Sequence, residues 1–126
     1  MLDLGKQIDY WLNAAKPDME VAEFLINTGR GRYGLFFCHL AVEKTLNALV
    51  VKAIQDLAPK SHNLTYLADK AGLDLDADTK EFFAFLMRYQ LEGRYPEFYP
   101  PPVDPKQATA ALTQTKELIE WLRQKS

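Results

Sequence analysis

Apolar residues recur at steps of three and four positions along the first part of the chain, which is the spacing of a one-sided helical stripe. The pattern predicts a helix from about Leu4 to Thr28, stopped by Gly29. Pro17 lies inside this segment, yet the stripe keeps its phase across it, so we expect one kinked helix rather than two. The residues of the stripe are Ile8, Leu12, Ala15, Met19, Ala22 and Ile26.

A second apolar segment runs from about Arg32 to Leu57 and has apolar side chains around most of its circumference. A helix that is apolar on several sides must contact several neighbours in the folded protein. We therefore predict that this segment is the central helix of the fold. Pro59 ends it, because the residue before a proline is disfavoured in helical conformation.

Capping residues mark two helices after this central one. Ser61 predicts the N-cap of a short helix, which Gly72 closes. Asp78 predicts the N-cap of a fourth helix, because Glu81 follows three residues later as a capping-box partner. The apolar residues of this fourth helix extend it to about Leu91.

The stretch 93–105 is the one irregular part of the pattern. Its five prolines exclude a helix through most of it. It also carries several aromatic side chains, which favours a role beyond that of a plain spacer. Asp104 followed by Pro105 predicts the start of a last helix, which reaches nearly to the C-terminus.

These elements together predict an all-α protein. We expect an antiparallel up-and-down helical bundle of four longer helices and one short helix, forming a single domain over residues 1–126. The apolar share of 48% and the charged share of 25% are those of an ordinary folded domain. The length of 126 residues is enough to bury a core without disulfides or metals.

Composition narrows the class of protein further. The net charge of −2 argues against a large basic surface for duplex DNA. The single cysteine, Cys38, excludes an internal disulfide, and its apolar neighbours predict a buried, inert thiol. One cysteine, two histidines and scattered carboxylates leave no metal-ligand pattern, so we expect neither a metal nor a resident cofactor.

The pattern of apolar residues also indicates where in the cell the protein is expected. Asp3 lies within the first residues and no apolar h-region follows it, so we do not expect a signal peptide. We expect no apolar run long enough to span a bilayer. A cytoplasmic protein without a membrane partner is therefore our expectation.

Glu43 and Lys44 lie in the middle of the otherwise apolar second helix. The simpler interpretation places both on a narrow solvated face, where charged side chains usually lie, and spacing alone favours it. The alternative starts from His39, which precedes Glu43 by one turn and therefore shares its face. A partly buried carboxylate beside an imidazole could order a binding site or hold an arginine from another helix.

Two further groups are candidates for ligand contacts. His62 lies in the first turn of the short helix, whose N-terminus attracts anions, although such a histidine is often only part of a capping turn. Arg88 lies near the end of the fourth helix, and Arg94 with Tyr95 lies in the proline-rich stretch. An arginine beside an aromatic ring can bind a phosphate, or it can be a structural pin bonded to a carboxylate such as Glu43. The sequence leaves both open.

Arg32 and His39 are seven positions apart, so two helical turns place them on one face. An arginine with a histidine could bind a phosphodiester and move its proton. With only two histidines and several arginines upstream in the chain, a chance match at some suitable spacing is the simpler interpretation.

Several motifs, in this order, resemble the HEPN domain family (higher eukaryotes and prokaryotes nucleotide-binding), and the similarity covers nearly the whole chain. The most specific is the helix 37–48, with its Ala-x-Glu-Lys-x-Leu-x-Ala pattern around Glu43 and Lys44. The others reinforce it by order and spacing: Tyr10-Trp11, Ser61-His62-Asn63-Leu64, Leu67-Ala68, Ala71-Gly72-Leu73 and Arg94-Tyr95-Pro96.

The resemblance implies a single HEPN-like five-helix bundle that commonly forms a homodimer. It also implies a small, separately encoded nucleotidyltransferase as partner, in a toxin–antitoxin-like pair. Many family members are RNA-cleaving toxins with an Arg-x(4–6)-His motif late in the chain. No histidine follows His62 here, so that motif is not found, and the chain resembles the nucleotide-binding or accessory branch.

We therefore expect a binding module rather than an enzyme. It would bind a nucleotide such as ATP, or an RNA phosphate, in a cleft lined by His62, Arg94, Tyr95, Glu43, Lys44, His39 and Arg88. One alternative is a metal-independent ribonuclease toxin that uses Arg32 with His39, or Arg94 with His62. Another is a purely structural subunit that only binds the nucleotidyltransferase.

A homodimer also has support from the apolar pattern. The second helix and the segment 82–89 hold more large apolar residues than we expect one small bundle to cover. Excess apolar surface in a protein of this size usually marks an interface. A symmetric dimer is the commonest assembly, so we expect a homodimer.

Overall fold

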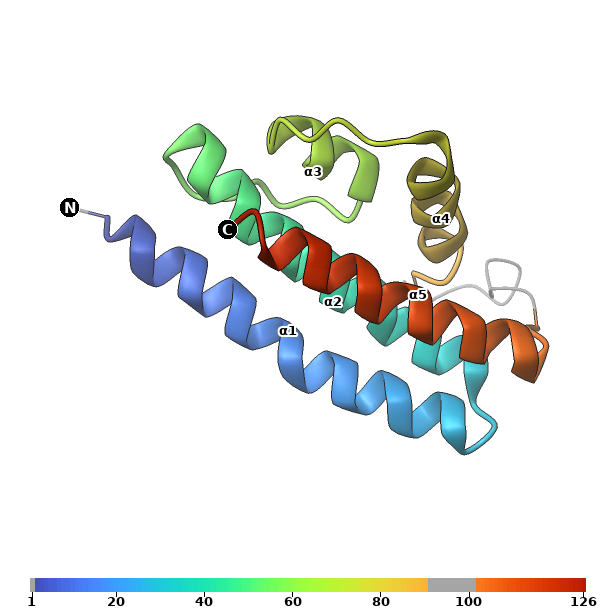
Figure 1. The fold of residues 1–126 in the computed structure, drawn as a ribbon. Helices are drawn as coiled ribbons and strands as arrows, with labels where there is room; N and C mark the ends of the chain where they lie inside the picture. The colour runs from blue at the N-terminus through green and yellow to red at the C-terminus, as the bar shows by residue number, and fades with distance from the viewer. Residues whose placement is uncertain (1, 91–101) are drawn as a thin grey trace.

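The computed structural model describes residues 2–90 and 102–126, and this part of the chain forms five helices without a strand. The predicted all-α class is confirmed. Figure 1 shows α1, α2 and α5 side by side along their lengths, with α3 and α4 on one side of α2 at a steep angle to it and α1 on the other side. The helices are α1 (Leu4–Asn27), α2 (Gly31–Ile54), α3 (Leu64–Lys70), α4 (Ala77–Met87) and α5 (Pro105–Arg123).

α1 and α2 form a long antiparallel hairpin. α1 continues through Pro17 as one helix, as the unbroken phase of its stripe predicts. The turn after it uses Gly29 at φ 83°, a left-handed conformation that glycine adopts without steric penalty. The two helices approach closely at Gly34, where an added Cβ would lie 2.5 Å from Cγ1 of Ile26. A residue without a side chain is therefore needed at this crossing.

α2 is the central helix, as predicted, and fourteen of its 24 residues are buried. By length and composition it could cross a membrane, with a mean hydropathy of 1.4, so the expectation that no apolar run would be long enough is wrong. Within the domain 78% of that apolar window is buried. Its apolar character therefore serves the core of the bundle.

α3 and α4 together form the return between α2 and α5. As a result α5 runs parallel to α2, which two contacts at opposite ends establish. At the start of both helices, a Cβ on Gly31 would lie 3.1 Å from that of Ala108. At their ends, Nζ of Lys52 donates to the carbonyl of Lys125 at 2.9 Å. The bundle is thus up-and-down, with two short helices in the third position (Figure 1).

Two of the predicted N-caps are wrong by two residues. Asn63 caps α3 by accepting from the N–H of Tyr66, while Ser61 only closes the preceding turn. Asp76 caps α4 by accepting from the N–H of Thr79 at 2.7 Å, so Asp78 lies in the first turn instead. Alternating aspartates offer two equivalent capping patterns, and only the packing of the chain selects one. Because Asp78 is not the N-cap, the predicted capping box between Asp78 and Glu81 is wrong as well.

Two helix ends also differ from prediction. α2 ends at Ile54 rather than near Leu57, because Gln55 turns to φ 56°. α4 ends at Met87 rather than near Leu91, and residues 91–101 lie outside the described residues. The predicted start of α5 is confirmed, with Asp104 accepting from the N–H of Lys106 and Pro105 as the first helical residue.

Most of the apolar side chains of α2 and α4 are covered within the domain itself, although Tyr33 and Ile54 of α2 are exposed. Phe82, Phe83 and Leu86 of α4, and Tyr89 just after it, are all buried against the core. Cys38 is fully buried as well, and this burial raises the pKa of its thiol to about 11, as expected of an inert cysteine. The argument for a dimer from these helices is therefore limited to a few exposed side chains of α2, and the dimer itself stays a prediction.

We expect Gly34→Ala to lower the free energy of unfolding by about 1–2 kcal/mol, because the added methyl group must push α1 away at Ile26 and at the carbonyl of Ala22. Gly5→Ala is the matched control, since its Cβ would meet only the Asp3 side chain, at 3.4 Å. That variant should be as stable as the natural protein or slightly more so. Urea denaturation followed by circular dichroism measures both, and equal stabilities would contradict the close crossing.

Candidate functional site

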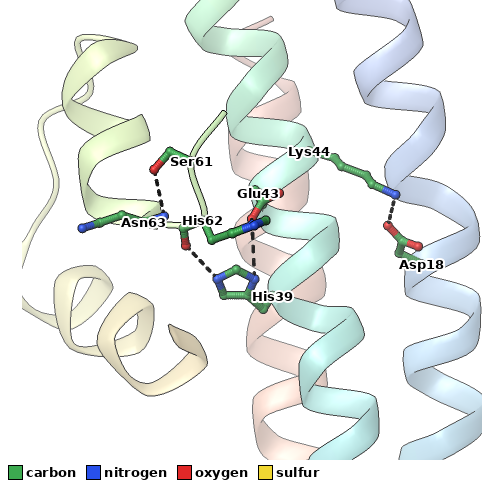
Figure 2. A network of polar contacts seen from close by, with 7 residues as sticks. All are labelled: Asp18, His39, Glu43, Lys44, Ser61, His62 and Asn63. Carbon is green, nitrogen blue, oxygen red and sulfur yellow. Dashed lines mark hydrogen bonds and ion pairs between the residues drawn. The ribbon is translucent and has the colours of Figure 1, made fainter. Parts of the chain in front are cut away.

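A network of polar side chains joins the middle of α2 to the segment before α3 (Figure 2). His39 and Glu43 lie one turn apart on the same face of α2, as their spacing predicts. Both point toward His62, where the chain enters α3. Oε1 of Glu43 lies 2.8 Å from Nδ1 of His62 and 3.9 Å from Nδ1 of His39. The two histidines of the chain thus meet at one carboxylate.

The hydrogen bonds of this network assign the protons of both rings. Nε2 of His39 lies 3.0 Å from the carbonyl oxygen of His62, which can only accept, so Nε2 is the donor. In the neutral ring, Nδ1 of His39 then carries a lone pair, and it has no hydrogen-bond partner among the described residues. Nδ1 of His62 donates to the Glu43 carboxylate. His39 therefore holds the backbone of His62, and Glu43 holds its ring.

Burial differs sharply across the three side chains. The His39 side chain is 0% exposed and that of Glu43 is 11% exposed, whereas that of His62 is 55% exposed. Burial lowers the pKa of His39 to about 4, because a charged imidazole would lose its hydration. Burial likewise raises the pKa of Glu43, an effect that the His62 hydrogen bond opposes. The network therefore presents the His62 imidazole at the surface and supports it with two buried side chains, His39 and Glu43.

Lys44 lies on another side of α2, as Figure 2 shows. Its Nζ pairs at 2.7 Å with Oδ2 of Asp18 on α1, a residue that is itself buried. Successive residues of a helix point about 100° apart, so Glu43 and Lys44 face different neighbours. The interpretation that both lie on one solvated face is wrong, because Glu43 faces His62 and Lys44 faces Asp18. The part of Lys44 in a ligand site stays a prediction. Lys44 ties α2 to α1.

The remaining candidates are placed as follows. Arg88 is exposed at the C-cap of α4 and forms no bond to His39, Glu43 or His62 among the described residues. Arg94 and Tyr95 lie outside the described residues, so their part in the site stays a prediction.

The hypothesis that Arg32 and His39 form a catalytic pair is contradicted by burial. The His39 side chain is fully enclosed, so no phosphodiester can reach it. A proton shuttle must also contact the group whose proton it moves. His39 therefore acts as a structural support within the network.

Two residues of structural importance were missed from the sequence. Asp18 falls on the buried face of α1 together with Ala15, Ala22 and Ile26, at steps of three and four. An acid at a stripe position predicts a buried partner, and this signal was available. Asn63 offered a weaker signal, because Ser61 two residues earlier is an equally good capping residue.

The described residues contain no group of three or more metal-ligating side chains, and a sizeable surface hollow lies elsewhere. That hollow, of about 660 Å³, lies between the start of α4 and the end of α5, with Leu75, Phe82 and Trp121 in its lining. None of its lining residues belongs to the His39, Glu43 and His62 network. We assign the candidate site to the network, because its chemistry is built on buried, ordered groups.

The His39 ring makes stability depend on pH. In the unfolded chain it takes up a proton near pH 6.5, but in the folded protein only near pH 4. Stability is therefore fully present above pH 6.5 and falls as the pH drops toward 4, by up to about 3 kcal/mol from this ring. His39→Gln keeps a donor for the His62 carbonyl and should flatten this fall.

Denaturant unfolding at several pH values measures the effect of His39→Gln. Glu43 acts in the opposite sense, because its pKa is raised from 4.5, but it is present in both proteins. The difference between them therefore isolates His39. Identical pH profiles of the two proteins would show that His39 is not the buried neutral ring described above.

Comparisons with known proteins agree with this fold. The crystal structure of TT1696 from Thermus thermophilus is similar with a TM-score of 0.77 and 21% identity, over 95% of this chain and 98% of that one. At this identity the likeness shows the fold alone. No curated protein matches the chain. The family model described as HEPN domain matches residues 8–125, so the chain belongs to the HEPN domain family.

Proposed function

We propose that this protein is a nucleotide- or RNA-binding HEPN module whose ligand contacts the exposed ring of His62. The observation that carries the proposal is the Glu43 carboxylate, which is nearly buried and orients a half-exposed imidazole at 2.8 Å. An ion is expensive to bury, so a carboxylate kept at this position needs a purpose. Orienting one surface histidine is a purpose that the geometry supports.

The support for a binding site lies in the restriction of the ring. Side chains on a surface usually exchange between rotamers, and ordering them on binding reduces affinity. Here Glu43 holds the ring, and His39 holds the backbone carbonyl of the same residue. His62 is thus ordered before a ligand arrives. From the sequence we propose that Arg94 contributes a phosphate contact and Tyr95 a stacking surface.

Assembly is the second part of the proposal and rests on the family. We propose that the protein forms a homodimer and is the partner subunit of a separately encoded small nucleotidyltransferase in a toxin–antitoxin-like pair. A cytoplasmic location fits both the binding of nucleotides or RNA and the pairing with a nucleotidyltransferase. A binding module is favoured over a ribonuclease, because the Arg-x(4–6)-His motif of the RNA-cleaving members is not found and His39 is enclosed.

Titration calorimetry with ATP, GTP and a short single-stranded RNA tests nucleotide binding. We expect His62→Ala to weaken the binding of at least one of these ligands by about tenfold, as the loss of one hydrogen bond to a charged group does. Arg94→Ala should weaken the same ligand. Binding of none of the three ligands by the natural protein, or unchanged binding by His62→Ala, would refute this site.

Lys116→Ala is the matched control for this titration. It removes an exposed polar side chain elsewhere on the bundle, where Nζ of Lys116 pairs with Glu23 of α1 at 2.8 Å in a contact between α5 and α1. Because that contact does not involve the His62 network, we expect its affinity for the ligand to equal that of the natural protein. A loss equal to that of His62→Ala would indicate a nonspecific effect of charge.

The nucleotidyltransferase partner has its own test. We expect the tagged protein, expressed from its natural locus, to co-purify with one small nucleotidyltransferase at a fixed ratio, as mass spectrometry of the eluted complex would show. A tagged Gly5→Ala variant serves as the positive control, since that change adds only one methyl group, whose nearest neighbour would be the Asp3 side chain at 3.4 Å. Recovery of the protein alone would leave the nucleotide-binding proposal standing and refute the pairing.

A further inference from the structure

The hollow between the start of α4 and the end of α5 lies apart from the His39, Glu43 and His62 network. Its volume of about 660 Å³ is within the range of small-molecule binding sites. Its walls come from the segment before α4, from the first turns of α4 and from the second half of α5. These segments are far apart in the chain, so the hollow exists only in the packed protein.

One part of the lining is apolar. Phe82 is buried in the core, and Leu75 and Leu118 pack against the core while they line the hollow. Trp121 adds a large aromatic surface that is 38% exposed. Because the core holds most of these side chains in place, the apolar wall is formed before a ligand arrives. It can cover an alkyl or aromatic group.

Three carboxylates stand beside this wall, those of Asp74, Asp76 and Glu117, and the described lining contains no cationic side chain. Neither Asp74 nor Glu117 has an ion-pair partner among the described residues. Asp76 accepts hydrogen bonds from Thr79, which lower its pKa and keep its carboxylate charged. Like charges around one hollow repel each other and create a negative potential in it. A cation that enters the hollow relieves this repulsion.

The Trp121 ring already binds one ammonium group of this chain. Nζ of Lys125 lies 4.6 Å from the centre of the ring, at the distance of a cation–π contact. Lys125 does not line the hollow, so its ammonium group does not fill it. The contact is direct evidence that this ring is open to a cation. The hollow combines the same ring with carboxylates, and both kinds of group attract organic ammonium ions.

We propose that this hollow binds a small organic cation, whose ammonium group lies near Asp74 and Glu117 and whose apolar body lies against the wall formed by Phe82 and its neighbours. A small molecule is favoured over a protein segment, because Trp121 is the one strongly exposed large apolar residue of the described lining, and a stable protein interface needs a broader apolar surface. The same carboxylates would repel an anionic nucleotide. The hollow therefore takes a different ligand from the His62 site, and this proposal is independent of the proposed function.

A nuclear magnetic resonance titration of the ¹⁵N-labelled protein tests the ligand class. The probes are 2-phenylethylammonium and its neutral counterpart of similar shape, 2-phenylethanol. The two tryptophans give two indole N–H signals, which Trp121→Phe assigns. We expect the ammonium probe to shift the Trp121 signal, with an affinity about fivefold or more above that of the alcohol. The signal of Trp11 should stay in place, because its Nε1 is buried. No shift at millimolar concentrations, or equal affinities of the two probes, would overturn the proposal.

A pair of double variants tests the carboxylates. Asp74→Asn with Glu117→Gln removes two charges from the hollow and should weaken binding of the ammonium probe by about fivefold. Asp78→Asn with Glu120→Gln is the matched control, since it removes the same charge from exposed residues of α4 and α5 that do not line the hollow. The control should bind like the natural protein. An equal loss in both double variants would show a general effect of net charge and refute the site.

Two further titrations separate this site from other occupants and from the His62 site. A response to a short lysine-rich peptide without any response to 2-phenylethylammonium would overturn the small-molecule ligand in favour of a protein partner. His62→Ala should leave binding of the ammonium probe unchanged, because His62 does not line the hollow. A loss of probe binding in His62→Ala would contradict the separation of the two sites. Absence of nucleotide binding would refute the His62 site alone, and absence of probe binding would refute the hollow alone.

Discussion

The burial of α2 is the constraint on which the rest of the structure depends. Fourteen of its 24 residues are enclosed, and its neighbours are arranged so that they cover it from several sides. The helix nonetheless carries polar groups, and a buried polar group must find a partner or it destabilises the fold. His39 and Glu43 find theirs in His62, and Lys44 pairs with the buried Asp18. The polar contacts of α2 therefore help to fix where α1 and the start of α3 pack on it, together with the apolar core.

The same contacts connect stability with the candidate site. His39 is neutral in the folded protein, because its enclosure lowers its pKa to about 4, and its Nε2 holds the carbonyl of His62. The carboxylate of Glu43 accepts a hydrogen bond from the ring of His62. The half-exposed imidazole is thus positioned by two groups that the core itself positions. A change at either one should affect both folding and the geometry of the surface, because one network serves both.

Sequence patterns predicted the features that depend only on residues close together in the chain. The three- and four-residue steps of α1 and the Asp104-Pro105 start each depend on neighbouring residues only, and the structure confirms both. The caps of α3 and α4 were misplaced by two residues because Ser61 competes with Asn63, and Asp78 with Asp76. Each pair offers similar local hydrogen bonds. The choice between them depends on where the helix must dock, which no local pattern contains.

The sequence alone determined the helical class, the central position of α2 and the sharing of one face by His39 and Glu43, because helical periodicity follows from backbone geometry. The resemblance of its motifs also pointed to the HEPN domain family, which the match over residues 8–125 shows. Only the tertiary structure decided that Glu43 faces His62 while Lys44 faces Asp18. It also decided that α4 is covered while Tyr10 and Phe24 are exposed. These outcomes depend on contacts between segments far apart in the chain, and such contacts exist only once the helices have packed.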